Sequence, residues 1–146
     1  MNKAFYFIAF LLLPSITFGA ELKPLTTDGC SVFPDGTIEH QSLWAHCCIR
    51  HDIAYWQGGT YDERLKADQS LEQCVSEVGE PEIAQLMLTG VRAGGSPYFP
   101  SSYRWGYGWP YSRGYKALTK EEKTKVIKNL KSLEILIKGI LKEIKP

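Results

Sequence analysis

The sequence predicts a mainly α protein with one domain, and three observations lead to this prediction. Apolar residues recur at helical spacings of three and four, whereas no segment alternates apolar and polar residues as a strand would. Glycines and prolines divide the chain into pieces of helix length. The length of 146 residues leaves room for one domain and little more.

The first twenty residues have the features of a secretory signal peptide. Lys3 gives a positive start, residues 4–13 form an apolar core, and Pro14 interrupts that core before two small residues. The core is shorter than the ~20 residues that a membrane-spanning helix needs. We therefore predict that residues 1–20 are removed and that the mature protein is secreted or periplasmic.

The mature chain begins with a loop and a first helix. Residues 21–37 contain several glycines and prolines without helical periodicity, so we expect a loop there. The first helix is expected from about Gln41 to Gln57. Its end is predicted by Gly58 and Gly59, because glycine commonly terminates helices.

Capping signals predict the next two helices. Thr60 and Glu63 form a capping box at the start of the second helix, which continues to about Val78. Pro81 suits the first position of a third helix, because its missing N–H would be unpaired there in any case. This third helix is expected to end at the glycine pair of residues 94–95.

The last third of the chain combines an aromatic segment with a long helix. Residues 96–115 hold eight aromatic residues among glycines and prolines, and we expect an ordered loop there. Thr119 and Glu122 form a second capping box, which begins the last helix. Its apolar residues are spaced four and three apart along one stripe: Val126, Leu130, Leu133, Ile137, Ile140 and Ile144.

Charge is unevenly distributed along the mature chain, which holds sixteen basic and sixteen acidic residues. Residues 116–146 contain nine lysines and four glutamates, so this part carries +5 and residues 21–115 carry −5. The acidic part suggests a bound cation, and the basic part an anionic surface. Aromatic residues with lysines also suit an anionic lipid surface. We nevertheless expect both the aromatic segment and the last helix to pack on the rest of the domain.

All four cysteines lie in the mature chain: Cys30, Cys47, Cys48 and Cys74. In an oxidising compartment, an even number of cysteines favours two disulfides over a zinc site. Side chains of adjacent residues on a helix diverge by roughly 100°, so we do not expect Cys47 and Cys48 to bond each other. Two cross-links to Cys30 and Cys74 remain, and either pairing is open.

Two polar residues interrupt apolar helix faces, His51 on the first helix and Asp68 on the second. A buried carboxylate is unfavourable unless it is paired. The two helices are joined by a short turn and should lie antiparallel, so facing residues have a nearly constant sum of their numbers. If Cys47 bonds Cys74, then His51 and Asp68 lie about one helical turn away on the same seam, and the imidazole meets the carboxylate.

Another face of the first helix carries Cys48 and Asp52, which are four residues apart. If Cys48 bonds Cys30, the loop around Cys30 is held beside the Asp52 carboxylate. That loop offers Asp28, Asp35 and backbone carbonyls. Several oxygen atoms without a free thiolate suit a hard cation such as calcium.

The segment CCIRHDIAY, with the pattern C-C-x-x-H-D-x-x-Y, resembles the active-site helix of the secreted phospholipase A2 family. The resemblance covers about residues 28–78 and includes Asp68 on the second helix. It implies a disulfide-linked antiparallel helix pair with a calcium-binding loop. Together with the patterns above, this predicts a phospholipase A2-like catalytic domain in residues 21–115, followed by the additional C-terminal helix in residues 116–146. The disulfides that it implies are Cys30–Cys48 and Cys47–Cys74.

The family resemblance also implies an activity, the calcium-dependent hydrolysis of the sn-2 ester of glycerophospholipids at a membrane or micelle surface. In this family His51 would be the base, Asp68 would orient it, and Tyr55 would hydrogen-bond to the Asp68 network. The loop DGCSVFPDG is similar to that of the prokaryotic and fungal branch. The calcium ligands implied by that branch are Asp52, the Asp28 side chain and the Gly29 carbonyl.

Two other functions are compatible with parts of the pattern. A catalytically silent relative could use the same scaffold to bind lipid or a protein partner, although such a protein has no evident need for His51, Asp52 and Asp68 together. A zinc module could use Cys47, Cys48 and His51, but export disfavours free thiolates. We expect a monomer that does not bind nucleic acid.

Overall fold

The computed structural model describes residues 20–111 and 113–144. Within those residues the protein contains four helices and no strand, which confirms the mainly α class. Residues 1–19 of the expected signal peptide lie outside this described part. The helices are α1 (Ala45–Gln57), α2 (Tyr61–Glu77), α3 (Pro81–Gly94) and α4 (Lys120–Ile144).

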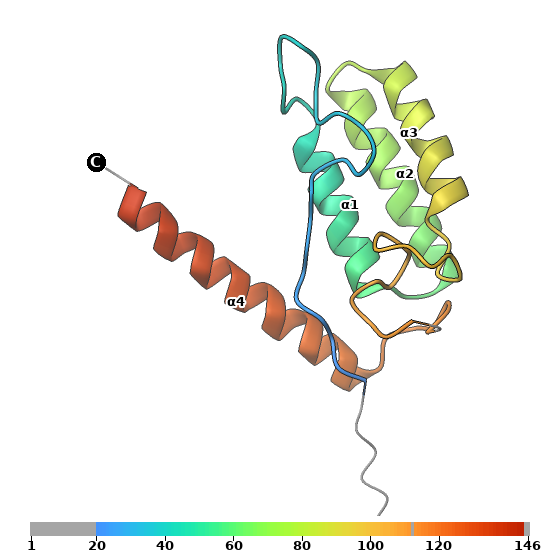
Figure 1. The fold of residues 1–146 in the computed structure, drawn as a ribbon, viewed down its shortest axis with the longest axis vertical. Coiled ribbons are helices and arrows are strands. Elements are labelled where there is room, and N and C mark those ends of the chain that lie inside the picture. Colours follow the sequence, from blue (N-terminus) through green and yellow to red (C-terminus); the bar gives the residue numbers. More distant parts are fainter. Residues whose placement is uncertain (1–19, 112, 145–146) are drawn as a thin grey trace, which may run out of the picture.

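Helices α1, α2 and α3, with their loops, form a three-helix body in which successive helices run in opposite directions (Figure 1). Helix α2 packs against both α1 and α3. Gly58 and Gly59 make the turn between α1 and α2 with positive φ angles of 66° and 150°. The predicted capping box starts α2, because the Glu63 carboxylate accepts a hydrogen bond from the Thr60 backbone N–H at 2.7 Å.

Helix α1 begins at Ala45, four residues later than the predicted start at Gln41. The Trp44 backbone N–H donates to the Asp35 carbonyl at 3.0 Å, and the Trp44 indole N–H donates to the Pro34 carbonyl at 2.7 Å. Trp44 is therefore held by the preceding loop and not by a helical turn. This tertiary contact overrides the local preference for an earlier helix start.

The buried residues fall into two clusters. One lies among the helices of the body and joins both disulfides to residues such as Trp44, Leu71 and Val75. The other brings together four distant parts of the chain through Leu22, Trp56, Trp109 and Val126. The second cluster therefore connects the body to the aromatic segment and to the start of α4.

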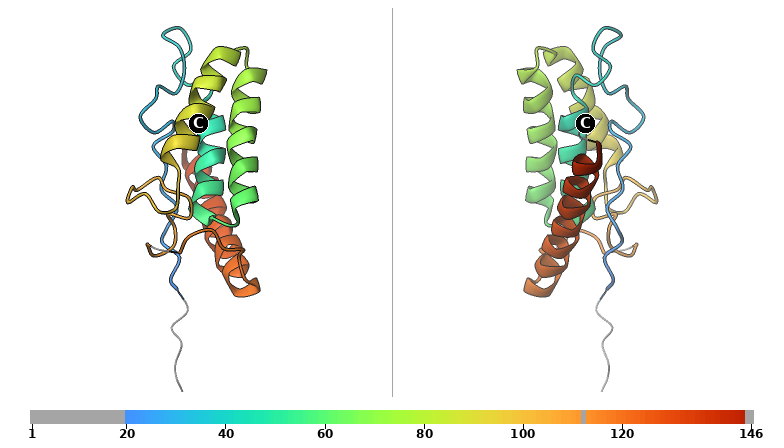
Figure 2. Two further views of the ribbon diagram at one scale, coloured as in Figure 1. Left: turned by 90° about the vertical axis from the view of Figure 1, so that its right-hand side faces the viewer. Right: turned by 90° about the vertical axis from the view of Figure 1, so that its left-hand side faces the viewer.

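The aromatic segment, residues 96–115, is folded over the end of the body where α1 and α3 finish (Figure 2). Trp105 and Trp109 are almost fully buried, and their indole N–H groups donate to the carbonyls of Gly59 and Gln57 at 2.9 and 2.7 Å. These bonds satisfy one carbonyl group at the end of α1 and one in the turn that follows it. Trp105 and Trp109 thus join the segment to the body, whereas Tyr98, Phe99 and Tyr111 of the same segment are exposed.

Helix α4 runs away from the three-helix body (Figure 1). It starts at the predicted capping box, where the Glu122 carboxylate accepts from the Thr119 N–H and also pairs with Arg113. Val126 is its one buried residue within Lys120–Ile144. We expected the apolar stripe to be covered by the body, but Ile137, Ile140 and Ile144 are exposed. No helix in the described part of the chain is both long and apolar enough to cross a membrane.

Candidate active site

The two disulfides join the residue pairs that the family resemblance implied. Cys30 is bonded to Cys48, with 5.0 Å between their Cα atoms, and Cys47 is bonded to Cys74, with 5.8 Å. Because Cys47 and Cys48 are adjacent on α1, the bonds leave the helix in two directions. One bond ties α1 to α2, and the other ties α1 to the loop that contains Cys30.

His51 and Asp68 meet on the seam between α1 and α2, as the antiparallel register predicted. His51 Nε2 lies 3.0 Å from Asp68 Oδ1, and the Tyr55 hydroxyl donates to the same oxygen at 2.7 Å. Asp68 is completely buried, and the His51 side chain is 9% exposed. The carboxylate therefore holds the imidazole by one nitrogen and leaves the other, Nδ1, to accept a proton.

Two arginines that were not predicted from the sequence face the other oxygen of Asp68. Arg92 Nε lies 2.9 Å from Asp68 Oδ2 in an ion pair without the alignment of a hydrogen bond, and Arg64 Nε lies 3.8 Å away. Arg64 is buried and donates to the Tyr55 hydroxyl at 3.1 Å. The two guanidinium groups compensate the charge of a carboxylate that would otherwise be unfavourable in the core.

Only one of these arginines had a signal in the sequence. Arg64 precedes Asp68 by four residues on α2, which is the spacing of a helical ion pair. Arg92 comes from α3, and no local pattern connects it to Asp68. Burial and the Asp68 carboxylate raise the pKa of Tyr55, so its hydroxyl keeps its proton and acts as a donor to Asp68.

Asp52 lies on the other side of α1, next to the loop. Its Oδ2 accepts a hydrogen bond from the Thr27 hydroxyl at 2.7 Å. Burial raises the pKa of Asp52 to about 6, and the negative charges of Asp28 and Asp35 add to this rise. The Thr27 hydrogen bond and His51 act in the opposite direction.

The loop before α1 is curled around the carboxylate of Asp35. Asp35 Oδ1 accepts from the Cys30 backbone N–H at 2.7 Å. Gly29 has a φ of +79°, and a Cβ atom added there would lie 2.3 Å from Asp35 Oδ1. Any side chain at Gly29 would therefore strain the backbone and displace Asp35. The loop conformation depends on this glycine.

The three predicted calcium ligands lie in one region, but they are not equally placed. Gly29 and Asp52 line the same cavity, whereas Asp28 accepts a hydrogen bond from the Ser31 hydroxyl at 2.7 Å and does not line that cavity. Asp28 is still near enough for its charge to raise the pKa of Asp52. The Gly29 carbonyl and the negatively charged carboxylates of Asp28 and Asp52 are oxygen donors, which suit a hard divalent cation such as calcium.

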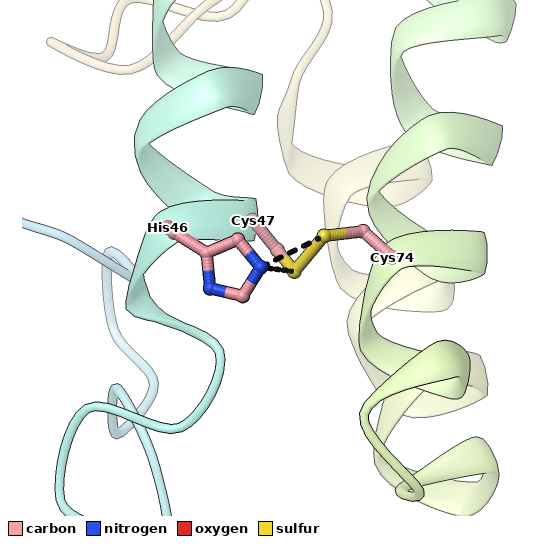
Figure 3. Close-up of side chains that lie close together, drawn as sticks. All are labelled: His46, Cys47 and Cys74. Atoms are coloured by element: carbon pink, nitrogen blue, oxygen red, sulfur yellow. Dashed lines mark hydrogen bonds between the residues drawn. A yellow bond between two sulfur atoms is a disulfide. The ribbon is translucent and has the colours of Figure 1, made fainter.

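One group of histidine and cysteine side chains within the described residues has the spacing of a metal site: His46, Cys47 and Cys74 (Figure 3). His46 Nε2 lies 3.5 Å from the Cys47 sulfur and 3.6 Å from the Cys74 sulfur. These sulfurs are bonded to each other, so neither offers the thiolate that zinc binds. The alternative zinc module of Cys47, Cys48 and His51 is contradicted for the same reason.

A cavity of about 410 Å³ opens beside His51 and Asp52. Its volume is typical of sites that hold small molecules. Most of the other side chains that line it are apolar, among them Phe33, Leu71, Leu86, Met87 and Val91. The cavity thus places a basic nitrogen and a carboxylate at the edge of an apolar space.

Comparison of the chain with protein-family models, with curated proteins and with solved structures gave no match. The functional interpretation therefore depends on the motif and on the geometry of the site.

Proposed function

We propose that this protein is an exported calcium-dependent phospholipase A2. In this proposal it hydrolyses the sn-2 ester of glycerophospholipids to a lysophospholipid and a free fatty acid. The observation that carries the proposal is the arrangement of His51, Asp68 and Tyr55 at the edge of an apolar cavity, with Asp52 beside them.

His51 acts as the general base. With its Nε2 proton directed at Asp68, the imidazole uses Nδ1 to take a proton from the water that attacks the ester carbonyl. The Asp68 carboxylate keeps the ring in this tautomer and stabilises the imidazolium that forms. Tyr55, Arg64 and Arg92 hold Asp68 in place. The imidazolium then returns its proton to the leaving alcohol.

The residues that would hold calcium are Asp52, Gly29 through its carbonyl, and Asp28. When bound, calcium supplies positive charge for the lipid phosphate and for the oxyanion that develops at the ester. Thr27 and Asp35 support this arrangement by orienting Asp52 and the loop.

The apolar cavity suits an acyl chain of the substrate. Leu71 and Met87 are buried in its wall, whereas Leu86 is exposed. An acyl chain in this cavity would remove apolar surface from water next to the base. This is consistent with a long-chain ester as substrate and gives no reason for a small polar one.

The decisive experiment measures fatty-acid release from phosphatidylglycerol vesicles whose lipids carry different chains at sn-1 and sn-2. We expect release of the sn-2 chain with calcium, none with excess chelator, and a loss of at least roughly 10³-fold in His51→Gln, the scale of removing a general base. His46→Gln is the matched control, since His46 is an exposed histidine of the same helix outside the cavity. Release that persists in chelator or in His51→Gln would overturn the proposal.

A further inference from the structure

We propose that α4 docks the protein on an anionic phospholipid bilayer, with the apolar stripe of α4 in the lipid interface. This inference deepens the proposed function, on which it rests for the claim that the bound lipid is also the substrate. Docking itself does not require catalysis. It follows from three properties of α4: an uncovered apolar face, the charge of its opposite face, and the absence of features that would pair it with a second copy.

The apolar face of α4 is left uncovered beyond its first turns. Leu130 and Leu133 are half-buried, whereas Ile137, Ile140 and Ile144 are 48, 44 and 69% exposed. Two further exposed residues, Leu136 and Leu141, flank the stripe. Contiguous apolar patches exposed on a protein surface mark sites of interaction with other proteins or with membranes.

The charge of α4 indicates the chemistry of its partner. The helix Lys120–Ile144 contains seven lysines and four glutamates. At about 100° per residue, Lys128, Lys131, Lys138 and Lys142 fall away from the apolar stripe. A helix with an apolar face and a lysine-rich polar face lies in the plane of a membrane interface and is attracted to anionic lipids.

A second copy of α4 would be a poorer partner than a membrane. Paired helices usually have a narrow apolar seam, with opposite charges at the positions beside it. Beside the exposed part of the stripe, residues 134–144, lie the apolar residues Leu136 and Leu141 and the glutamates Glu134 and Glu143, whereas the lysines nearest the stripe, Lys123 and Lys125, lie in the first turns of the helix. The stripe is thus too wide for a two-stranded seam, and it lacks the ion pairs that would fix a register.

The test uses the mature chain, residues 21–146, with His51→Gln so that vesicles stay intact. We expect this protein to sediment with phosphatidylglycerol vesicles, to bind phosphatidylcholine vesicles much more weakly, and to dissociate in high salt. Ile140→Glu should weaken binding about tenfold or more. Each of Lys131→Gln, Lys138→Gln and Lys142→Gln should weaken it about fivefold.

Ile135→Glu is the matched control, because Ile135 is an exposed isoleucine of the same helix on the face opposite the stripe. It adds the same negative charge without removing apolar surface from the stripe, so it should weaken vesicle binding about fivefold, as one lysine replacement does, and clearly less than Ile140→Glu does. Equal losses in Ile135→Glu and Ile140→Glu, or no vesicle binding at all, would overturn the inference. So would a dimer in light scattering that Ile140→Glu dissociates without any vesicle binding. If the parent binds vesicles but the chain with His51 restored releases no fatty acid, docking stands and the proposed hydrolysis fails.

Discussion

The three-helix body and α4 share one kind of sequence pattern, apolar residues three and four positions apart, yet they use it differently. In the body the pattern is covered: Leu71 and Val75 of α2 are buried against disulfides and neighbouring helices. In α4 most of the apolar residues that follow the same periodicity are exposed or only half-buried. Periodicity therefore predicts that a helix has an apolar face, but it does not predict what covers that face.

The largest effect on stability should come from removing the disulfide that holds the body together. Replacing Cys47 and Cys74 by serine should lower the free energy of unfolding by ~2–5 kcal/mol, as is typical for a disulfide in a small domain. Urea denaturation checks this. Deleting residues 134–146 should leave the denaturation midpoint of the body nearly unchanged, and a loss as large as that of the disulfide variant would show that α4 is part of the core.

Replacing one apolar side chain by alanine in each region compares the two apolar faces directly. Leu71→Ala should cost ~2–5 kcal/mol, because it leaves a cavity beside the Cys47–Cys74 disulfide. Ile140→Ala should change stability by less than ~0.5 kcal/mol, the usual range for exposed positions. Thermal unfolding of both variants decides the point. Similar losses would mean that the stripe of α4 is buried in solution.

Because the pKa of Asp52 is raised, the stability of the three-helix body should depend on pH in a way that the stability of α4 does not share. Its pKa is raised from 3.8 to about 6, so the folded protein binds a proton there more readily than the unfolded chain does. Without calcium, the stability contribution of Asp52 therefore falls as pH rises from about 4 to about 6. Calcium needs the ionised carboxylate, so its affinity should fall by up to about tenfold per pH unit below pH 6.

Calorimetric titration with calcium at pH 5, 6 and 7 measures this dependence. Asp52→Asn is the control, and it should bind calcium weakly at all three values. An affinity that stays constant from pH 7 to pH 5 would remove Asp52 from the set of ligands.

The smallest expected effect on stability concerns Glu122, at the point where α4 joins the rest of the protein. The ion pair with Arg113 holds the pKa of Glu122 at about 2, so the stability from Glu122 is present above pH 4.5 and is lost as pH falls towards 2. Glu122→Gln keeps the capping box but loses the ion pair, and should cost less than ~1 kcal/mol at pH 7. Glu122→Ala loses both and should cost more. Equal thermal stability of the two variants would show that the cap contributes nothing.

Much of the fold could be predicted because local chemistry determines it. Both capping boxes begin their helices where Thr60 and Thr119 predicted, and the register of α1 and α2 brings His51 to Asp68. What could not be predicted depends on contacts between distant segments. Arg92 reaches Asp68 from α3, and Trp44 delays the start of α1 by bonding to the preceding loop.

The adjacent cysteines of α1 have a consequence for when this site can exist. Cys47 is bonded to Cys74 of α2, and its neighbour Cys48 is bonded to Cys30 of the loop. Both disulfides are therefore missing together in a chain whose thiols are still reduced. Such a chain would lack both the covalent link that holds the Cys30 loop beside Asp52 and the link that holds α2, with Asp68, beside His51. Both cross-links form only when the thiols are oxidised, so an oxidising environment is a condition for completing the site.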